Sequence, residues 1–176
     1  LGDLRAQIAA CRVGDRGLGA LVKRYGLETF LRCVRAIWHQ SEALAREQVA
    51  RIKPGQYEAE ALFDSDGVDL DTAVPLKVKV EVAGSEMVID FSEISEQVPG
   101  SINSGESGAV AAARVAFKSL VAPYSPIDEG CFRPLKIIIP KGKILSATAP
   151  APVGNWSRTL PTVIDLIFRA LAPAMP

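Results

Sequence analysis

The hydrophobic positions in the first third of the chain repeat with the period of an α-helix. One stripe lies within residues 3–25 and a second runs from residue 27 to residue 52. Asp3 can cap the start of the first helix, and Gly26 separates the two helices. Because the connection is short, we expect an antiparallel helical hairpin over residues 1–53. The stripes consist of Leu4, Ile8, Cys11, Leu18, Val22 and Tyr25, and of Leu27, Phe30, Val34, Ile37, Leu44 and Ile52.

After residue 53 the hydrophobic period changes to two, which is typical of half-exposed antiparallel strands. Three such strands are predicted, at residues 57–63, 75–82 and 86–91. The run "PLKIIIP" at residues 134–140 is almost continuously apolar, so we expect a strand that is buried on both faces. These four segments predict one mixed, mainly antiparallel sheet.

Two further helices are expected in the second part of the chain, an alanine-rich one at residues 108–121 and a last one at residues 159–172. The last helix tolerates Pro161 only within its first turn. The predicted fold class is therefore α+β, with a long antiparallel helical hairpin packed beside a mixed sheet with two further helices. The predicted domains are the hairpin at 1–53 and an α+β sheet region at 54–176. A chain of 176 residues that is 48% hydrophobic can bury such a core.

The net charge is zero, which argues against general affinity for nucleic acid. The charges are nevertheless unevenly distributed. Residues 1–53 carry ten basic and five acidic side chains, residues 54–106 carry two and twelve, and residues 107–176 carry eight and three. Two interpretations stay open: opposite faces meet within one assembly, or each segment merely has a solvated face.

Cysteine and histidine are sparse. The cysteines, Cys11, Cys33 and Cys131, are widely spaced and form no zinc pattern, which fits a reducing cytosol. The single histidine, His39, lies on the polar side of a predicted helix and reads as a solvated side chain. One histidine argues against a His-rich metal site and a Ser-His-Asp triad within this chain.

The chain shows no targeting or membrane signal. No apolar run approaches the roughly 20 residues of a membrane span, and the start lacks the layout of a signal peptide. We therefore expect a cytoplasmic protein that binds neither membrane nor nucleic acid. Because the sequence opens without Met and already inside a helical pattern, we expect it to be a piece of a longer polypeptide.

Two loops are candidates for ligand binding. "NSGESGAV" at 103–110 has the small residues and free amides of an anion-binding helix start, but it lacks the lysine of a P-loop. "PVGNWSRT" at 152–159 places Asn155 and Arg158 before a helix. An ordinary loop and helix cap is the alternative in both cases. The acidic stretch "DSDGVDLD" at 64–71 lacks the order of an EF-hand and is read as a turn.

The stretch "DEGCFRPLKIIIPKG" places a cysteine and an arginine directly before an aliphatic run. Cys131 reads as a buried structural thiol, because only Arg133 nearby in sequence would lower its pKa. Arg133 itself either pairs with a carboxylate or faces a cleft, where its fork of donors can orient an anion.

Five stretches carry a further signal when they are taken together: "GDLRAQIAACRVGDRGLGALVKRYG", "YEAEALFDSDG", "VIDFSEISEQVPGSIN", "DEGCFRPLKIIIPKGKIL" and "PAPVGN". They resemble the hydantoinase B/oxoprolinase family, and they occur in the family's order over almost the whole chain. After the final Gly154-Asn155 the chain departs from the family pattern, since Arg158 stands near a position where an acid or small polar residue is usual.

The resemblance implies the central part of a B-type subunit of an ATP-dependent cyclic amide hydrolase that opens hydantoins, N-methylhydantoins or 5-oxoproline. It implies ATP and a divalent metal ion for the whole enzyme, with metal ligands outside this chain, and an A-type, ATP-using partner subunit. We expect the fragment alone to be inactive. Two alternatives stay open: a subunit of an ATP-dependent ketone carboxylase, and a non-catalytic scaffold that binds the partner subunit.

Five polar residues are candidates for contact with the substrate or its phosphate under this resemblance. Arg133, Asn103 and Asn155 are placed on the substrate side. Asp3 and Gln7, from "GDLRAQ", are expected to face the part of the enzyme that holds the metal. No residue of the chain is assigned as a metal ligand or as a cofactor ligand.

Overall fold

The computed structural model describes residues 1–154 and 156–175, which form two compact units, residues 1–40 and residues 41–176. The described part contains four α-helices and one four-stranded sheet, which confirms the predicted α+β class. The elements are α1 (Gly2–Tyr25), α2 (Leu27–Val49), β1 (Gly55–Phe63), β2 (Val74–Ala83), β3 (Glu86–Asp90), α3 (Glu106–Val121), β4 (Leu135–Ile138) and α4 (Trp156–Leu171), with short 3₁₀ helices at Glu129–Phe132 and Ala172–Ala174.

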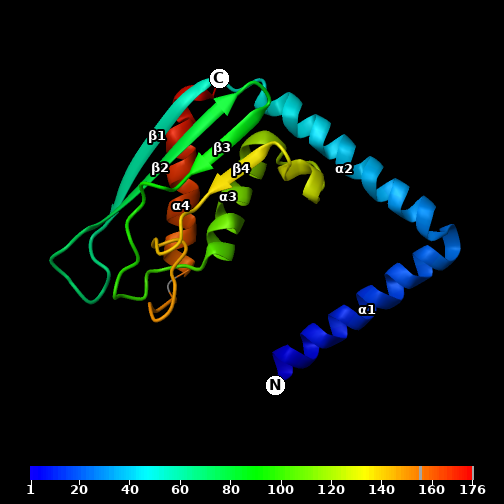
Figure 1. The fold of residues 1–176 in the computed structure, drawn as a ribbon, viewed down its shortest axis with the longest axis horizontal. Coiled ribbons are helices and arrows are strands. Elements are labelled where there is room, and N and C mark those ends of the chain that lie inside the picture. The colour runs from blue at the N-terminus through cyan, green and yellow to red at the C-terminus, as the bar shows by residue number, and fades with distance from the viewer. Residues whose placement is uncertain (155, 176) are drawn as a thin grey trace. The chain divides into compact units, whose positions relative to one another are not determined.

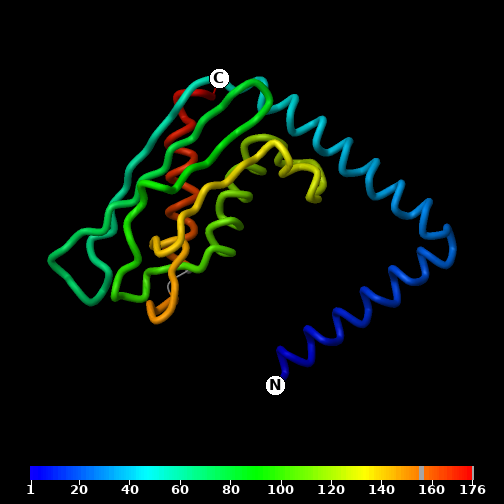
Figure 2. The backbone as a smooth tube through the Cα atoms, in the orientation of Figure 1, coloured from blue at the N-terminus to red at the C-terminus, as the bar shows by residue number. Residues whose placement is uncertain are grey.

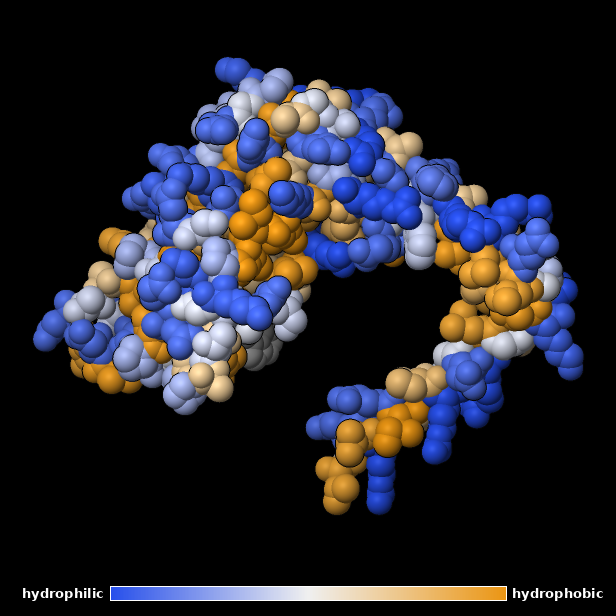
Figure 3. All heavy atoms as spheres, viewed as in Figure 1, coloured by the Kyte–Doolittle hydropathy of each residue, from blue (hydrophilic) through white to orange (hydrophobic). Residues whose placement is uncertain are grey.

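The first unit contains α1 and most of α2, and both helices begin where the periodicity predicts. Gly26 joins them with φ +80°, a conformation that favours glycine because it has no Cβ. No residue of α1 is buried, and its stripe residues Leu4 and Leu18 are more than half exposed. Figure 3 shows hydrophobic side chains at the surface of both helices.

The last turns of α2 belong to the second unit because their apolar side chains enter its core. Ala45 and Val49 are fully buried, whereas the helix residues before them are exposed or half-buried. The second unit therefore begins inside the helix, at Ser41, and not at residue 54, where the pattern changes from helix to strand.

The sheet has the strand order β1-β2-β3-β4, with two antiparallel pairs and a parallel pair of β3 and β4. Tyr57 lies opposite Val80, and Val80 lies opposite Ile89. Since side chains alternate across a strand, this register places the apolar residues of neighbouring strands on one face. Helices α3 and α4 cover that face (Figure 1). The chain from β3 through α3 to β4 is a crossover between two adjacent parallel strands.

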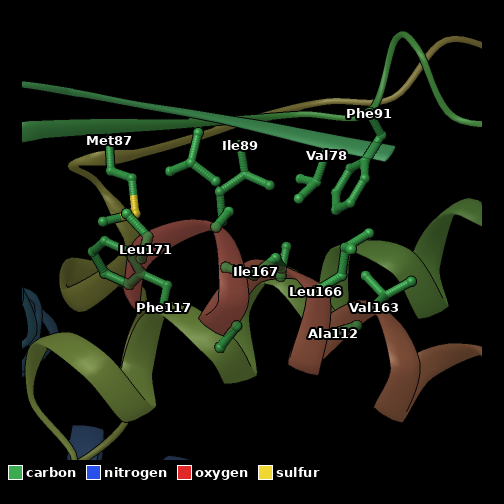
Figure 4. Close-up of a cluster of buried hydrophobic side chains, with 14 of the residues drawn as sticks. Val78, Met87, Ile89, Phe91, Ala112, Phe117, Val163, Leu166, Ile167 and Leu171 are labelled. Carbon is green, nitrogen blue, oxygen red and sulfur yellow. The ribbon is translucent and has the colours of Figure 1, made fainter. Parts of the chain in front are cut away.

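The core lies between the sheet and these two helices. Val78, Ile89 and Phe91 point from the sheet side toward Leu166 and Ile167 of α4, as Figure 4 shows. Each of these five side chains is at most 1% exposed, and burying a side chain of this size contributes roughly 1.5–3 kcal/mol. The alanine-rich sequence of α3 has a packing reason, since Ala109, Ala112, Ala113 and Ala116 are all buried.

Two details of the expected elements were wrong. β4 is not buried on both faces: Lys136 is exposed and the other strand residues are half-buried, because β4 is an edge strand. Pro161 is not in the first turn of the last helix, because α4 begins earlier than expected, at Trp156. The proline lies in the second turn, so α4 lacks the backbone hydrogen bond that an N–H at this position would make.

None of the helices in residues 1–154 and 156–175 combines the length and the apolar character that a membrane span requires.

Candidate functional site

Three loops meet at the end of the sheet where the parallel strands β3 and β4 finish. They comprise residues 64–73 between β1 and β2, residues 91–105 before α3, and residues 139–154 before α4. Figure 2 shows all three at the same end of the sheet. Single β-bridges join Glu96 to Lys143 and Ile102 to Val153. In α/β crossovers, ligands bind outside the carboxyl ends of parallel strands, so this loop cluster is the candidate site.

Asn103 holds two of these loops together. Its side chain is fully buried, and its Oδ1 accepts a hydrogen bond from the backbone N–H of Val98 at 2.9 Å. Its Nδ2 donates to the carbonyl oxygens of Val98, Gly100 and Pro152 at 2.7–2.9 Å. The amide is therefore occupied by backbone groups on both sides. In this structure Asn103 positions the loops, and its role as a substrate ligand stays a prediction.

Asp66 joins the third loop to the cluster. Its Oδ1 accepts from the N–H groups of Val68 and Asp69, and its Oδ2 accepts from the N–H of Gly100, each at 2.8 Å. The bonds from Val68 and Asp69 are the largest causes that hold the pKa of Asp66 below its usual value, because they stabilise the charged form. The expected acidic turn therefore has an ordered, buried carboxylate at its centre.

The starts of both covering helices are fastened to the same loops. Ser104 donates its backbone N–H to the Ile144 carbonyl at 2.7 Å and accepts from the Ala147 N–H at 3.1 Å. The buried hydroxyl of Thr159, in α4, donates to the Ile102 carbonyl at 2.6 Å. The loops expected to bind a ligand thus lie side by side, and hydrogen bonds to backbone groups hold them together.

A hollow of about 310 Å³ lies on this cluster and is lined by Gln97, Val98, Pro99, Pro150, Ala151 and Pro152. A larger hollow, of about 580 Å³, lies on the outer face of the sheet, with Lys79, Glu81, Val88 and Asp90 among its lining residues. Charges on that face pair with one another. Lys77 contacts Glu60, Glu58 and Glu93 at 3.2–3.4 Å, and the bond with Glu60 is the largest cause that raises the pKa of Lys77. The outer face therefore resembles a solvated sheet surface.

Arg133 lies at the opposite end of β4 from Asn103, so these two candidates do not share one site. Its Nη1 donates to Glu42 Oε2 in α2 at 2.8 Å. This bond, followed by the one from Arg46, holds the pKa of Glu42 below its usual value. Arg133 therefore pairs with a carboxylate, one of the two roles expected from its place before the strand. Its role as a substrate ligand stays a prediction.

Cys131 is buried in the short helix before Arg133, as expected. Its thiol donates to the Asp128 carbonyl at 3.0 Å and accepts from the Asp128 N–H at 3.3 Å. Asp128 also accepts a hydrogen bond from the Ser41 hydroxyl at 2.5 Å. These contacts are those of a structural thiol.

The remaining candidates lie elsewhere. Asp3 and Gln7 are exposed on α1, in the first unit, and Asn155 lies outside the described residues. His39 is exposed on α2. Over the described ranges, no group of three or more His, Cys, Asp or Glu side chains is placed to hold a metal ion. The described residues therefore do not provide the divalent metal site that the resemblance implies for the whole enzyme.

Sequence reasoning missed Asp66, Gln97 and Gly100. A Cβ at Gly100 would lie 1.8 Å from the Asp66 carbonyl oxygen, so only glycine fits there. The signal for this contact is non-local, because 34 positions separate the two residues. The acidic turn and the glycine were visible in the sequence, but no pattern pairs them.

A sequence profile described as hydantoinase B/oxoprolinase matches residues 1–176. The chain belongs to the hydantoinase B/oxoprolinase family. It is 31% identical to the putative B subunit of a D-/L-hydantoinase of Pseudomonas sp. (strain NS671), over 100% of this chain and 31% of that protein. It is 29% identical to the 5-oxoprolinase of Saccharomyces cerevisiae, over 96% of this chain and 13% of that protein. The chain thus spans less than a third of these relatives.

Two solved structures share the fold of this chain. The crystal structure of the ATP-dependent caprolactamase from Pseudomonas jessenii matches with a TM-score of 0.89 and 28% identity, over 99% of this chain and 30% of that one. A nucleotide-free acetone carboxylase structure matches with a TM-score of 0.80 and 19% identity, over 98% of this chain and 24% of that one. At that identity, the second match shows the fold alone. This member of the hydantoinase B/oxoprolinase family therefore shares its fold with the caprolactamase over 99% of its length.

Proposed function

We propose that this chain is the central part of the B-type subunit of an ATP-dependent cyclic amide hydrolase. The observation that carries the proposal is the family match over all 176 residues. Three relatives support it by name: the putative hydantoinase, the 5-oxoprolinase and the caprolactamase. Hydantoin, 5-oxoproline and caprolactam are all cyclic amides, so the shared substrate class is a lactam ring.

The proposed chemistry explains why ATP is needed. A lactam is a poor electrophile, and transfer of the γ-phosphoryl group of ATP to its amide oxygen, which releases ADP, makes the ring carbon more electrophilic. Water adds to that carbon, and hydrogen-bond donors stabilise the charge that develops. The ring C–N bond then breaks as the nitrogen takes up a proton, and a second water hydrolyses the resulting acyl phosphate to a carboxylate and phosphate. The loop cluster is suited to a role in this reaction, because hydrogen bonds of Asn103 and Asp66 to the backbone hold the loops in place before a substrate binds.

The whole enzyme needs parts that this chain does not provide. The hydantoinase and caprolactamase relatives are each named as one subunit of their enzyme, which supports a partner subunit here. We take this partner to be the A-type, ATP-using one. The metal implied for the whole enzyme would be held by residues outside this chain, so no step is assigned to it here. We therefore expect residues 1–176 alone to be inactive. A cytoplasmic location is supported by the free cysteines Cys11, Cys33 and Cys131.

Five polar residues are proposed to contact the substrate. They are Arg133, Asn103, Asn155, Asp3 and Gln7. Arg133 is separate from Asn103 because it lies at the opposite end of β4, paired with Glu42. Its replacement by alanine in the full-length protein tests its role. Unchanged turnover of a normally folded variant removes Arg133 from the site.

The test of the function uses the full-length parent protein with its partner subunit. ADP release is followed with hydantoin, 5-oxoproline or caprolactam, and with a ketone plus bicarbonate as the control reaction. We expect release with at least one cyclic amide. Release only with ketone and bicarbonate establishes the carboxylase alternative, which the fold of acetone carboxylase leaves open. If none of these compounds stimulates ADP release and the partner subunit still binds tightly, the scaffold alternative is established.

A further inference from the structure

The walls of the hollow on the loop cluster are mainly apolar and rich in proline. Pro99, Pro150 and Pro152 line it together with Val98 and Ala151. Proline has no N–H, so these positions present apolar rings and no backbone donor. Gln97 provides the polar side chain among the lining residues. The volume of about 310 Å³ is at the lower end of the range of ligand pockets, which favours a small ligand.

The orientation of the Gln97 amide is set by its neighbours. Its Oε1 accepts from the backbone N–H of Thr148 at 2.8 Å and from the Thr148 hydroxyl at 3.2 Å. A backbone N–H can only donate, so the atom that faces it must be the amide oxygen. Within the part of the chain that the structure describes, no protein acceptor bonds the Gln97 amide nitrogen. Its two N–H groups therefore remain for a ligand.

The walls are held in place from behind. Asn103 bonds the backbone of Val98 on one side of the hollow and the carbonyl of Pro152 on the other. The same side chain also bonds Gly100, which Asp66 holds from the third loop. Both rims of the hollow are thus fixed by one buried amide, and a ligand would find the geometry already formed.

We propose that this hollow is a subsite for the ring of a small cyclic amide, with the Gln97 side-chain amide donating a hydrogen bond to the ring's carbonyl oxygen. The proline, valine and alanine walls pack against the apolar ring atoms, and the carbonyl supplies the acceptor that Gln97 lacks within the protein. This assignment rests on the proposed function and names the group that binds its substrate. Gln97 is a binding residue, and no covalent step is assigned to it.

The test is Gln97→Glu in the full-length protein with its partner subunit. Glutamate keeps an oxygen for the Thr148 N–H, so the loop contact stays, but a carboxylate oxygen replaces the donating nitrogen. We expect KM for the cyclic amide to rise at least about tenfold, because a hydrogen bond is lost and a negative charge faces the carbonyl oxygen. KM for ATP should stay within twofold. Gln56→Glu, which makes the same change on the exposed strand β1, is the matched control.

A KM for the cyclic amide within twofold of the parent value in an active Gln97→Glu enzyme overturns the subsite. If the parent opens no cyclic amide, the proposed function fails separately, and ligand-observed NMR with hydantoin, 5-oxoproline and caprolactam then tests the subsite. Binding that Gln97→Glu abolishes and Gln56→Glu retains supports it. Absence of binding, or binding that both variants retain, overturns it.

Discussion

The contact between Gly100 and Asp66 shows how much one residue decides at the site. The amide of Gly100 donates to the Asp66 carboxylate, and a Cβ at Gly100 would collide with the Asp66 backbone. The obstacle is therefore a carbonyl group of the main chain, which cannot move aside as a flexible side chain can. The two loops must shift if anything larger than glycine stands at this position.

Gly100→Ala is expected to destabilise the second unit by about 1–3 kcal/mol, the usual range for overpacking. The added Cβ would lie 1.8 Å from the Asp66 carbonyl oxygen. Urea unfolding of both proteins measures the difference. Gly154→Ala, in the same loop cluster, is the control, because its Cβ would meet Ser101 at ordinary distances of 3.4 Å and more. Equal stability of the two variants would contradict the tight contact.

Asp66→Asn tests the charge of the same contact. Asparagine has one oxygen, so it cannot accept all three N–H groups, and we expect a lower melting temperature at neutral pH. The pKa of Asp66 is lowered in the folded state, so its stabilising effect is present above the ordinary aspartate value of about 3.9 and is lost as the pH falls through the folded value.

The melting difference between the parent and Asp66→Asn should therefore shrink toward acid. Asp64→Asn, at an exposed position of the same turn, is the control for the loss of one negative charge. A difference that stays constant from pH 7 to acid would show that the carboxylate charge is not what holds the turn.

Single-residue roles were the hardest to predict. Asn103 was chosen as a polar group of a ligand loop, and the structure places it in that loop cluster, but buried behind the hollow. Gln97 gave no signal in the sequence, since the contact that orients its amide is with Thr148, 51 positions away. Arg133 had two open interpretations, and only the fold shows that Glu42 lies beside it.

At the scale of elements, the sequence predicts what depends on local periodicity. The stripe of the first helix predicts α1, and the alternation of β2 matches its burial along the whole strand. The order of strands is not local, so the edge position of β4 and its half-exposed residues could not be read from an apolar run. The same holds for the end of α2, which enters a core formed by distant residues.

Leu166→Ala tests whether α4 covers the sheet as described. Leu166 is fully buried, and its truncation is expected to cost about 2–5 kcal/mol through lost burial and the cavity left behind. Urea unfolding gives the value. Leu18→Ala on α1 serves as the control, since Leu18 is 54% exposed and should change stability by no more than about 0.5 kcal/mol. A comparable loss in both variants would contradict the position of the core.

At the scale of the whole molecule, the chain consists of a helical unit without a buried side chain in α1 and a second unit with a continuous core. Every buried residue of that core lies between Ala45 and Ala174. The separate helices of residues 1–40 gain little from packing within the described chain. Most of the stability of a helix in a protein comes from the packing of its apolar face.

Removal of residues 1–40 is therefore expected to leave the cooperative unfolding of residues 41–176 in place. The midpoint of urea unfolding, followed by near-ultraviolet circular dichroism, should stay within error of that of the full 176-residue chain, because the core is retained. Loss of the cooperative transition on removal of these residues would show that the second unit depends on the helices.

Analysis of the products shows whether the full-length protein opens cyclic amides, as proposed. The full-length protein, its partner subunit and ATP are incubated with each cyclic amide, and the ring-opened product is counted against the ADP formed. We expect ring-opened product in proportion to ADP with at least one of these amides, and none when either subunit or ATP is omitted. ADP formation without ring opening, or product only from a ketone and bicarbonate, would contradict it.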